Sequence, residues 1–152
     1  MKILRGVYHF AFLAADVLLF SGMLVGGEKK LMHCFYFTAI ESATQADWDA
    51  FHKATDQLTK QIPGLTHVWY GKLIRPMAQF NPDAEARKKF DDRTNSATGQ
   101  FSRRIRGHGV CMEMNDQQTL KTYANHPAHK EWEKVYAKVR QPGTMTFDLI
   151  GE

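Results

Sequence analysis

Two hydrophobic periodicities alternate along residues 32–150, and this alternation restricts the fold more than any other feature of the chain. Runs that repeat every second residue, as strands do, occupy 32–40, 65–72, 107–114 and 144–150. Runs that repeat every three or four residues, as amphipathic helices do, lie between the first two strands and between the last two. This order predicts an α+β fold, a ferredoxin-like antiparallel four-stranded sheet with helices on one face.

Both faces of the predicted sheet carry large side chains. In the first strand, His33, Phe35 and Phe37 share the face that the helices would cover. The opposite face carries Cys34 and Tyr36, and the second strand adds aromatic residues. Because a bare apolar sheet face is unfavourable in water, we expect a second copy of the chain to cover it in a homodimer.

A polar insertion, residues 73–106, separates the second and third strands and is long for a connection inside a compact domain. It holds eight Lys/Arg against four Asp/Glu, which accounts for the whole formal net charge of +4. Asn81 as cap and Pro82 at the first position predict a short helix over 82–92. The insertion fits either a solvated surface excursion or a lid that gates a site or binds an anion. Three arginines would serve such a lid: Arg103, Arg104 and Arg106.

The segment 123–129, Tyr-Ala-Asn-His-Pro-Ala-His, sets a phenol and two imidazoles beside a helix start. A short helix that Asn115 would cap is predicted to lead into this segment. His126 precedes Pro127, which disfavours the α region at His126 and so ends this helix, while Pro127 begins the next. In that second helix His129 lies on the same stripe as Trp132, which we expect to be buried. For His126 itself, a capping or turn role is the simpler interpretation.

Two strand histidines, His33 and His108, have the phase to face the same place as Tyr123 and His129. The sequence therefore predicts a small, mostly apolar pocket between sheet and helices, with His126 as a further candidate for substrate binding. A neutral imidazole can remove a proton next to a carbonyl while a tyrosine hydroxyl donates to the developing oxyanion. The alternative is structural: Tyr123 and His129 bond each other or the backbone and fix the helix break.

Residues 32–152 resemble the stress-responsive dimeric α/β-barrel family. The matching motifs are Tyr123-x-x-His126-Pro127-x-His129, Ile62-Pro63-Gly64, Tyr70-Gly71-Lys72 and Phe147-Asp148. The resemblance implies a homodimer with a pocket between sheet and helices. It also implies chemistry like that of the plant polyketide cyclases in this family, whose intramolecular aldol condensation uses a tyrosine and a histidine at the positions of Tyr123 and His129. His33 and His108 match two further histidines that line the cyclase cavity. The cyclases have only a short connection where this chain has its insertion.

Two functions follow from this reading. The first is a cofactor-free lyase or cyclase that acts on a carbonyl compound, with His129 as base and Tyr123 as acid or oxyanion donor. The second is a non-catalytic homodimer that binds a small hydrophobic or aromatic ligand or a partner.

Clustered histidines also raise the alternative of zinc, although the chain has no His-x-x-x-His spacing. The wider group that the chain resembles includes haem enzymes, but no residue is singled out as an axial ligand. We therefore expect no metal and no cofactor. At 43% hydrophobic and 24% charged residues the composition is that of a globular protein, and no nucleic-acid recognition module is readable in it.

Residues 1–30 form an apolar N-terminal segment apart from the domain, which we place at 31–152. Lys2 and Arg5 precede an apolar run over 7–25, as in an export signal or a membrane anchor. A true start at Met32 is a further interpretation. We expect a cytoplasmic protein if translation starts there, and an exported or membrane-anchored one if the segment is a signal.

The two cysteines, Cys34 and Cys111, share a face on neighbouring strands. We expect buried thiols, with a disulfide only in an exported chain.

Overall fold

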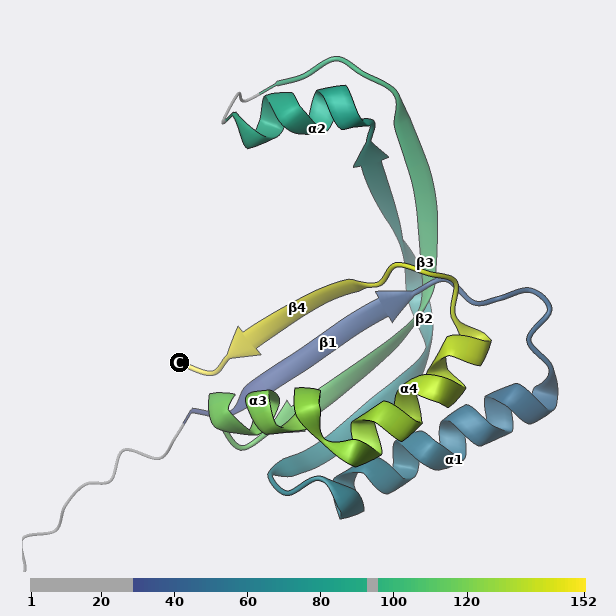
Figure 1. Cartoon of the computed structure of the whole chain (residues 1–152), viewed down its shortest axis with the longest axis vertical. Helices are drawn as coiled ribbons and strands as arrows, with labels where there is room; N and C mark the ends of the chain where they lie inside the picture. Colours follow the sequence, from purple (N-terminus) through teal and green to yellow (C-terminus); the bar gives the residue numbers. More distant parts are fainter. Residues whose placement is uncertain (1–28, 93–95) are drawn as a thin grey trace, which may run out of the picture.

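The computed structural model of the chain describes residues 29–92 and 96–152. Within these ranges four strands and four helices follow one another (Figure 1). The strands are β1 (Leu31–Phe37), β2 (Leu65–Pro82), β3 (Phe101–Met114) and β4 (Met145–Ile150), and the helices are α1 (Gln45–Gln61), α2 (Ala84–Asp91), α3 (Gln117–Asn125) and α4 (Pro127–Val139). The predicted signal or anchor lies outside the described residues, except for its last two. No helix of the described part is long and apolar enough to span a membrane.

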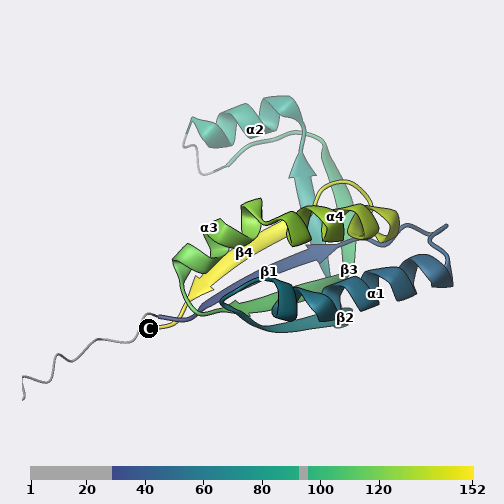
Figure 2. The same cartoon turned by 60° about the horizontal axis from the view of Figure 1, so that its bottom comes forward.

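The strands form one antiparallel sheet in the order β2-β3-β1-β4, so the predicted ferredoxin-like α+β fold is confirmed. Helices α1, α3 and α4 cover one face of it (Figure 1), and α1 and α4 run side by side along that face (Figure 2). Local signals set the helix ends. Thr44 and Asp47 cap the start of α1 reciprocally, and Pro127 occupies the first turn of α4.

The core fills the space between the sheet and these helices. Its aromatic part comes from β1, α1, α3 and α4 and consists of Phe35, Phe37, Phe51, Tyr123, Trp132 and Tyr136. The indole Nε1–H of Trp132 donates to Thr55 Oγ1 at 2.9 Å, which satisfies the polar edge of a buried ring. Each fully buried side chain of this size contributes about 1.5–3 kcal/mol to the free energy of folding. Burial of these rings is therefore the main interaction that holds α1 and α4 on the sheet.

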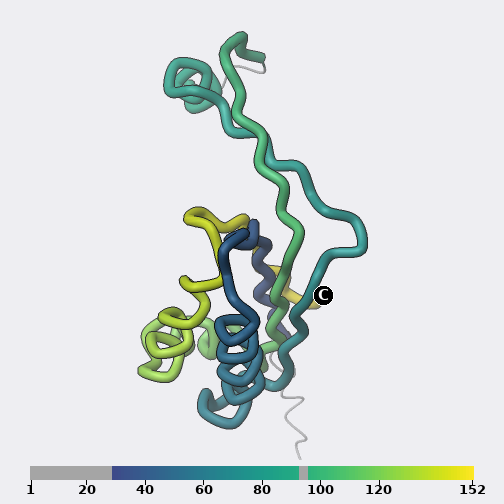
Figure 3. The backbone as a smooth tube through the Cα atoms, turned by 90° about the vertical axis from the view of Figure 1, so that its right-hand side faces the viewer, coloured from purple at the N-terminus to yellow at the C-terminus, as the bar shows by residue number. Residues whose placement is uncertain are grey.

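The sequence predicted a loop with one short helix for the insertion. The structure shows instead that the insertion extends the β2–β3 hairpin. Residues 77–82 pair with 101–106, and the chain between them forms α2. Figure 3 shows this hairpin projecting far from the rest of the domain. We call residues 73–106 the arm and the remainder of 31–152 the body. A bulge lies at the base of the arm, where the four residues 73–76 of β2 lie opposite the single residue 107 of β3.

Two predicted caps were misplaced by one or two residues. Helix α2 begins after Asp83, whose carboxylate accepts from the Ala86 amide at 2.8 Å, rather than after Asn81. Helix α3 begins after Asp116, whose carboxylate accepts from the Thr119 amide at 2.6 Å, rather than after Asn115. In both cases an aspartate nearer the helix has the better reach to the free amides of the first turn.

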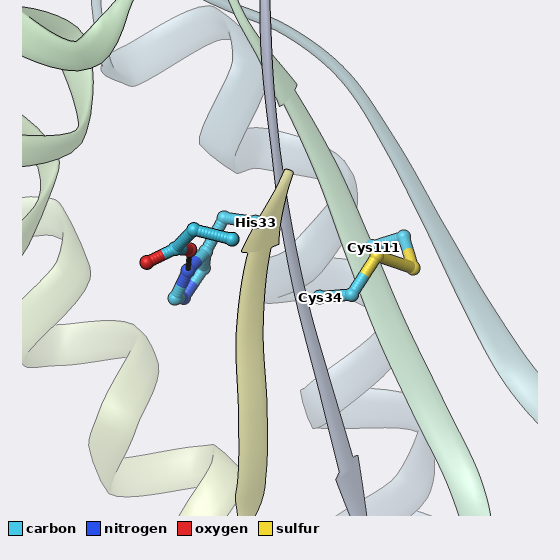
Figure 4. The surroundings of a disulfide bond; sticks show 4 residues. His33, Cys34 and Cys111 are labelled. Carbon is cyan, nitrogen blue, oxygen red and sulfur yellow. Dashed lines mark hydrogen bonds and ion pairs between the residues drawn. A yellow bond between two sulfur atoms is a disulfide. The ribbon is translucent and has the colours of Figure 1, made fainter. Parts of the chain in front are cut away.

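The expectation of free thiols is wrong, because Cys34 and Cys111 form a disulfide between β1 and β3. The two residues are direct partners in the strand register, with Cα atoms 4.1 Å apart. Figure 4 shows the disulfide and His33 on opposite sides of β1, as the predicted alternation requires.

Candidate functional site

The structure divides four of the five predicted site residues between two places. His33, Tyr123 and His129 lie together where β1, α3 and α4 meet, and we call them the packed group. The Tyr123 and His129 ring centroids are 4.2 Å apart, and those of Tyr123 and His33 are 5.7 Å apart. Asp148 on β4, the cross-strand partner of His33, accepts a hydrogen bond from it, with 2.6 Å between Nδ1 and Oδ1.

Burial controls the protonation of two members of the packed group, Tyr123 and His129. Tyr123 is only 3% exposed, and desolvation raises the pKa of its hydroxyl well above the ordinary value, with a smaller contribution from Glu133. Desolvation lowers the pKa of His129, and the carboxylate of Glu133 opposes this shift. At neutral pH Tyr123 is therefore a proton donor and His129 a neutral base. The Nδ1 atom of His129 is buried without a hydrogen-bond partner.

His108 lies elsewhere, in the wall of a cavity of about 570 Å³ between α1 and strands β2 and β3, which we call the His108 cavity. The imidazole stacks on Phe37, with centroids 5.5 Å apart, and lies 5.0 Å from the Trp48 ring. Its Nδ1 atom is buried without a hydrogen-bond partner. Desolvation lowers the pKa of His108, and the nearby Lys72 and His52 lower it further.

Sequence analysis did not select the other polar residues of this cavity. His52 of α1 stacks on Tyr70 of β2 with centroids 5.1 Å apart, and the Tyr70 hydroxyl donates to Asp56 Oδ1 at 2.7 Å. Burial and this carboxylate raise the pKa of Tyr70 to about 12, so the phenol stays protonated. Lys72 is the cross-strand partner of His108. The lining residues are Phe37, Ala39, Gln45, Trp48, Phe51, His52, Tyr70, Gly71, Lys72, His108 and Gly109.

The core rings separate the two places. His33 and Phe37 are four residues apart on β1, and His108 pairs with Phe37, so the two histidines are roughly 13 Å apart along the strands. Rings of Phe35, Trp132 and Tyr136 contact one another in between. The prediction that one pocket gathers all four residues is therefore wrong for His108.

His126 lies at the helix break and acts as a cap. Its backbone closes α3, and its Nδ1 accepts from the Ala128 amide at 3.2 Å to begin α4. Among the described residues, no group of three or more His, Cys, Asp or Glu side chains is placed to hold a metal ion.

No protein-family model matches the chain, and no curated protein is significantly similar to it in sequence. Several solved structures are similar in fold. Hydroxynitrile lyase from Passiflora edulis superposes with a TM-score of 0.55 at 13% identity, covering 83% of this chain and 95% of that one. A dimeric ferredoxin-like protein of unknown function from Thermobifida fusca gives 0.53 at 14% identity, covering 81% and 92%. A DABB family protein from Mesorhizobium loti gives 0.50 at 16% identity, covering 82% and 99%. These similarities establish the ferredoxin-like fold.

Proposed function

We propose that this chain is one subunit of a homodimeric α/β-barrel protein that binds a small aromatic or hydrophobic carbonyl compound in the His108 cavity and acts on it as a cofactor-free lyase or cyclase. One observation carries the proposal. An imidazole kept neutral by burial and a lysine lie as cross-strand neighbours in the wall of a cavity large enough for a small molecule.

The lining of the cavity indicates the ligand. Phe37, Trp48 and Tyr70 present ring surfaces suited to a planar apolar molecule. Lys72 and His108 supply a cation and a neutral base on neighbouring strands, where the oxygen atoms of a carbonyl or enol would be recognised. A ligand with an aromatic or alkyl body and a carbonyl end satisfies both parts.

The chemistry follows from the protonation states. Neutral His108 accepts a proton from the carbon next to the carbonyl, and the electron pair moves onto the carbonyl oxygen to form an enolate. The Lys72 ammonium stabilises that negative charge in a partly desolvated site. The enolate then attacks a second carbonyl or expels a leaving group, and the imidazolium returns its proton to the product.

The homodimer is supported by the outer face of the sheet. Trp69, Phe147 and Leu149 lie there about half exposed, on the side opposite the helices. Several structurally similar proteins are described as dimeric, including the one from Thermobifida fusca. We propose that two copies pack these faces together.

A second candidate places the chemistry in the packed group, with His129 as base and Tyr123 as acid or oxyanion donor. The 4.2 Å between their rings and their opposite pKa shifts favour it, as does the resemblance of the segment 123–129 to the plant polyketide cyclases. In this version His33, oriented by Asp148, binds the substrate. His126 is left with its capping role.

Proton exchange distinguishes these candidates without knowledge of the product. The protein is incubated in heavy water with a panel of aryl ketones and β-diketones, and exchange of the protons next to the carbonyl is followed by NMR. We expect His108→Ala to slow catalysed exchange by about 10²–10⁴-fold. The control is His67→Ala, which removes an exposed histidine from outside the cavity lining.

The other outcomes have defined meanings. Loss of exchange in Tyr123→Phe and His129→Ala, with His108→Ala unaffected, selects the packed group. Binding that is lost in His108→Ala and Lys72→Met, with no exchange in any variant, selects the non-catalytic binding protein. If no panel compound binds and none exchanges, the proposed ligand class is wrong.

A further inference from the structure

The arm continues the outer face of the sheet. Along β3, residues two apart face the same way, so Ile105 and Phe101 of the arm lie on the face that carries Cys111 in the body. Phe80 of β2 is the direct partner of Arg103, and such cross-strand partners share a face. The extra residues of the bulge belong to β2, so they do not change the alternation of β3.

Large apolar side chains lie exposed along this face from the body to the arm, with Arg103 between them on the arm. Its large exposed side chains, which we call the outer stripe, are Ile105 (38%), Trp69 (46%), Phe147 (45%), Phe101 (48%), Leu149 (60%) and Phe80 (61%). Single exposed apolar residues are ordinary on a protein surface. A row of six on one face, which runs from β4 across the sheet and up the arm, is typical of an interface.

The opposite face of the arm is held against the body of its own chain. Arg106 is only 2% exposed and donates to the Gly143 carbonyl of the body at 2.7 Å, while two further bonds hold it to Gln79 Oε1 on the other strand of the arm, at 2.9 Å from Nε and 2.6 Å from one terminal nitrogen. Arg104 donates to the Pro142 carbonyl at 2.6 Å. These bonds fix the arm so that it points away from its own sheet (Figure 3) and leaves the outer stripe uncovered.

The charges of the arm and the body are complementary. The arm, residues 73–106, has eight Lys/Arg against four Asp/Glu, whereas residues 31–72 and 107–152 together have eight against ten. Two arms would repel each other, but an arm and the body of another copy attract. The occupant that fits the stripe is therefore the body of a second copy.

We propose that the arm docks on the body of a second copy of this chain, so that the outer stripe forms one continuous dimer interface that begins at the paired sheets and ends beyond them. The inference rests on the homodimer of the proposed function and adds the arm to it. The arm then gives each subunit a contact that a bare ferredoxin-like sheet lacks.

The first test measures the dimer dissociation constant by analytical ultracentrifugation of the full chain. A triple variant, Phe80→Ser with Phe101→Ser and Ile105→Ser, should weaken the dimer by about 10²-fold, as expected when central aromatic contacts of an interface are removed. The matched control is Ile74→Ser, which removes an almost fully exposed apolar side chain from the bulge. Circular dichroism and thermal unfolding of each variant at low concentration establish that the body stays folded.

A second variant separates failure of the arm from failure of the dimer. Phe147 lies on the sheet part of the outer stripe. The substitution Phe147→Asp should therefore dissociate the dimer whether or not the arm docks. If Phe147→Asp dissociates the dimer and the triple arm variant does not, the arm inference is overturned while the homodimer stands. If the wild-type chain is monomeric at every concentration tested, the homodimer and the arm inference both fall.

Photo-crosslinking gives an independent readout that does not depend on stability. A benzoylphenylalanine in place of Phe80 is activated in a mixed sample of nitrogen-14 and nitrogen-15 chains, and the crosslinked peptides are identified by mass spectrometry. Docking predicts mixed-isotope crosslinks from the arm to body residues of the other chain. Crosslinks confined to one chain, or running only from arm to arm, would overturn the inference.

Discussion

The packed group and the His108 cavity are built from the same kinds of residue on the same face of one sheet, yet ring packing closes the first and leaves the second open. In the packed group, Tyr123 of α3 and His129 of α4 lie against each other. At His108, the α1 residues facing the imidazole leave a cavity of about 570 Å³. The comparison teaches that alternation fixes the side to which a histidine points, whereas the bulk of its neighbours decides whether a ligand can reach it.

The largest expected effect comes from the ring layer that keeps the two places apart. Trp132→Ala should lower the free energy of unfolding by about 3–5 kcal/mol, because it removes a buried indole and leaves a cavity. Urea unfolding followed by circular dichroism measures it. Trp69→Ala is the matched control, since its indole is half exposed on the outer face, and its loss should be much smaller at low protein concentration. If both variants lost the same free energy of unfolding, Trp132 would not be part of the ring layer between the packed group and the His108 cavity.

A smaller effect, of opposite sign, is expected at the open site. His108→Leu should raise the free energy of unfolding by about 1 kcal/mol, because it removes a buried nitrogen that has no hydrogen-bond partner. The same variant should lose ligand binding, as expected when a functional polar group is replaced for stability. Chemical unfolding without ligand measures the first effect. A clear loss of stability would show that the imidazole supports the fold rather than the site.

Acidification should lower the free energy of unfolding of the chain through one histidine in each place, His108 and His129. Burial lowers the pKa of His108 and of His129 below the ordinary 6.5, so between that value and the lower folded-state values the unfolded chain binds protons that the folded chain does not. Stability is therefore fully present above about pH 6.5 and falls as the pH is lowered below it.

Urea midpoints at pH 7.5, 6.5 and 5.5 measure this dependence. The fall should be shallower in His108→Asn and in His129→Asn than in the wild type, and unchanged in His67→Asn, where an exposed histidine is replaced. A midpoint that rises on acidification would contradict the assignment of neutral imidazoles.

The smallest effect is expected at the edge of the packed group. Asp148→Asn removes the carboxylate that orients His33, but Asp148 is substantially exposed, so the stability change should be within about 1 kcal/mol. The histidine resonances report the change in ring environment by NMR. If the packed group is catalytic, the same variant should lower turnover far more than stability. If it is structural, both changes should be small.

Strand alternation predicted the two faces of β1 because the direction of each side chain depends only on its position in the strand. It could not predict that His33 and His108 lie apart, because residues on one face still differ in their place along the strand. The Lys72–His108 pair could not be predicted from the sequence for a related reason. It depends on the register between β2 and β3, which a bulge shifts. His52 was missed because it flanks the buried stripe of α1 without belonging to it.

The arm was mispredicted for a different reason. Its strands lie outside the core, so their apolar residues do not alternate as those of a half-buried strand do, and their pairing with each other is what keeps them extended. Because a hydrophobic pattern indicates burial, it predicts a loop where such an exposed hairpin lies. Short-range signals performed better, and both misplaced helix starts were wrong by no more than two residues.

The disulfide closes a covalent ring that contains the whole arm, since Cys34 precedes it and Cys111 follows it. A protease that cuts the backbone anywhere in residues 73–106 would leave both halves tied through sulfur. Such a nicked molecule would keep its mass apart from one added water, and its two pieces would part only in reductant.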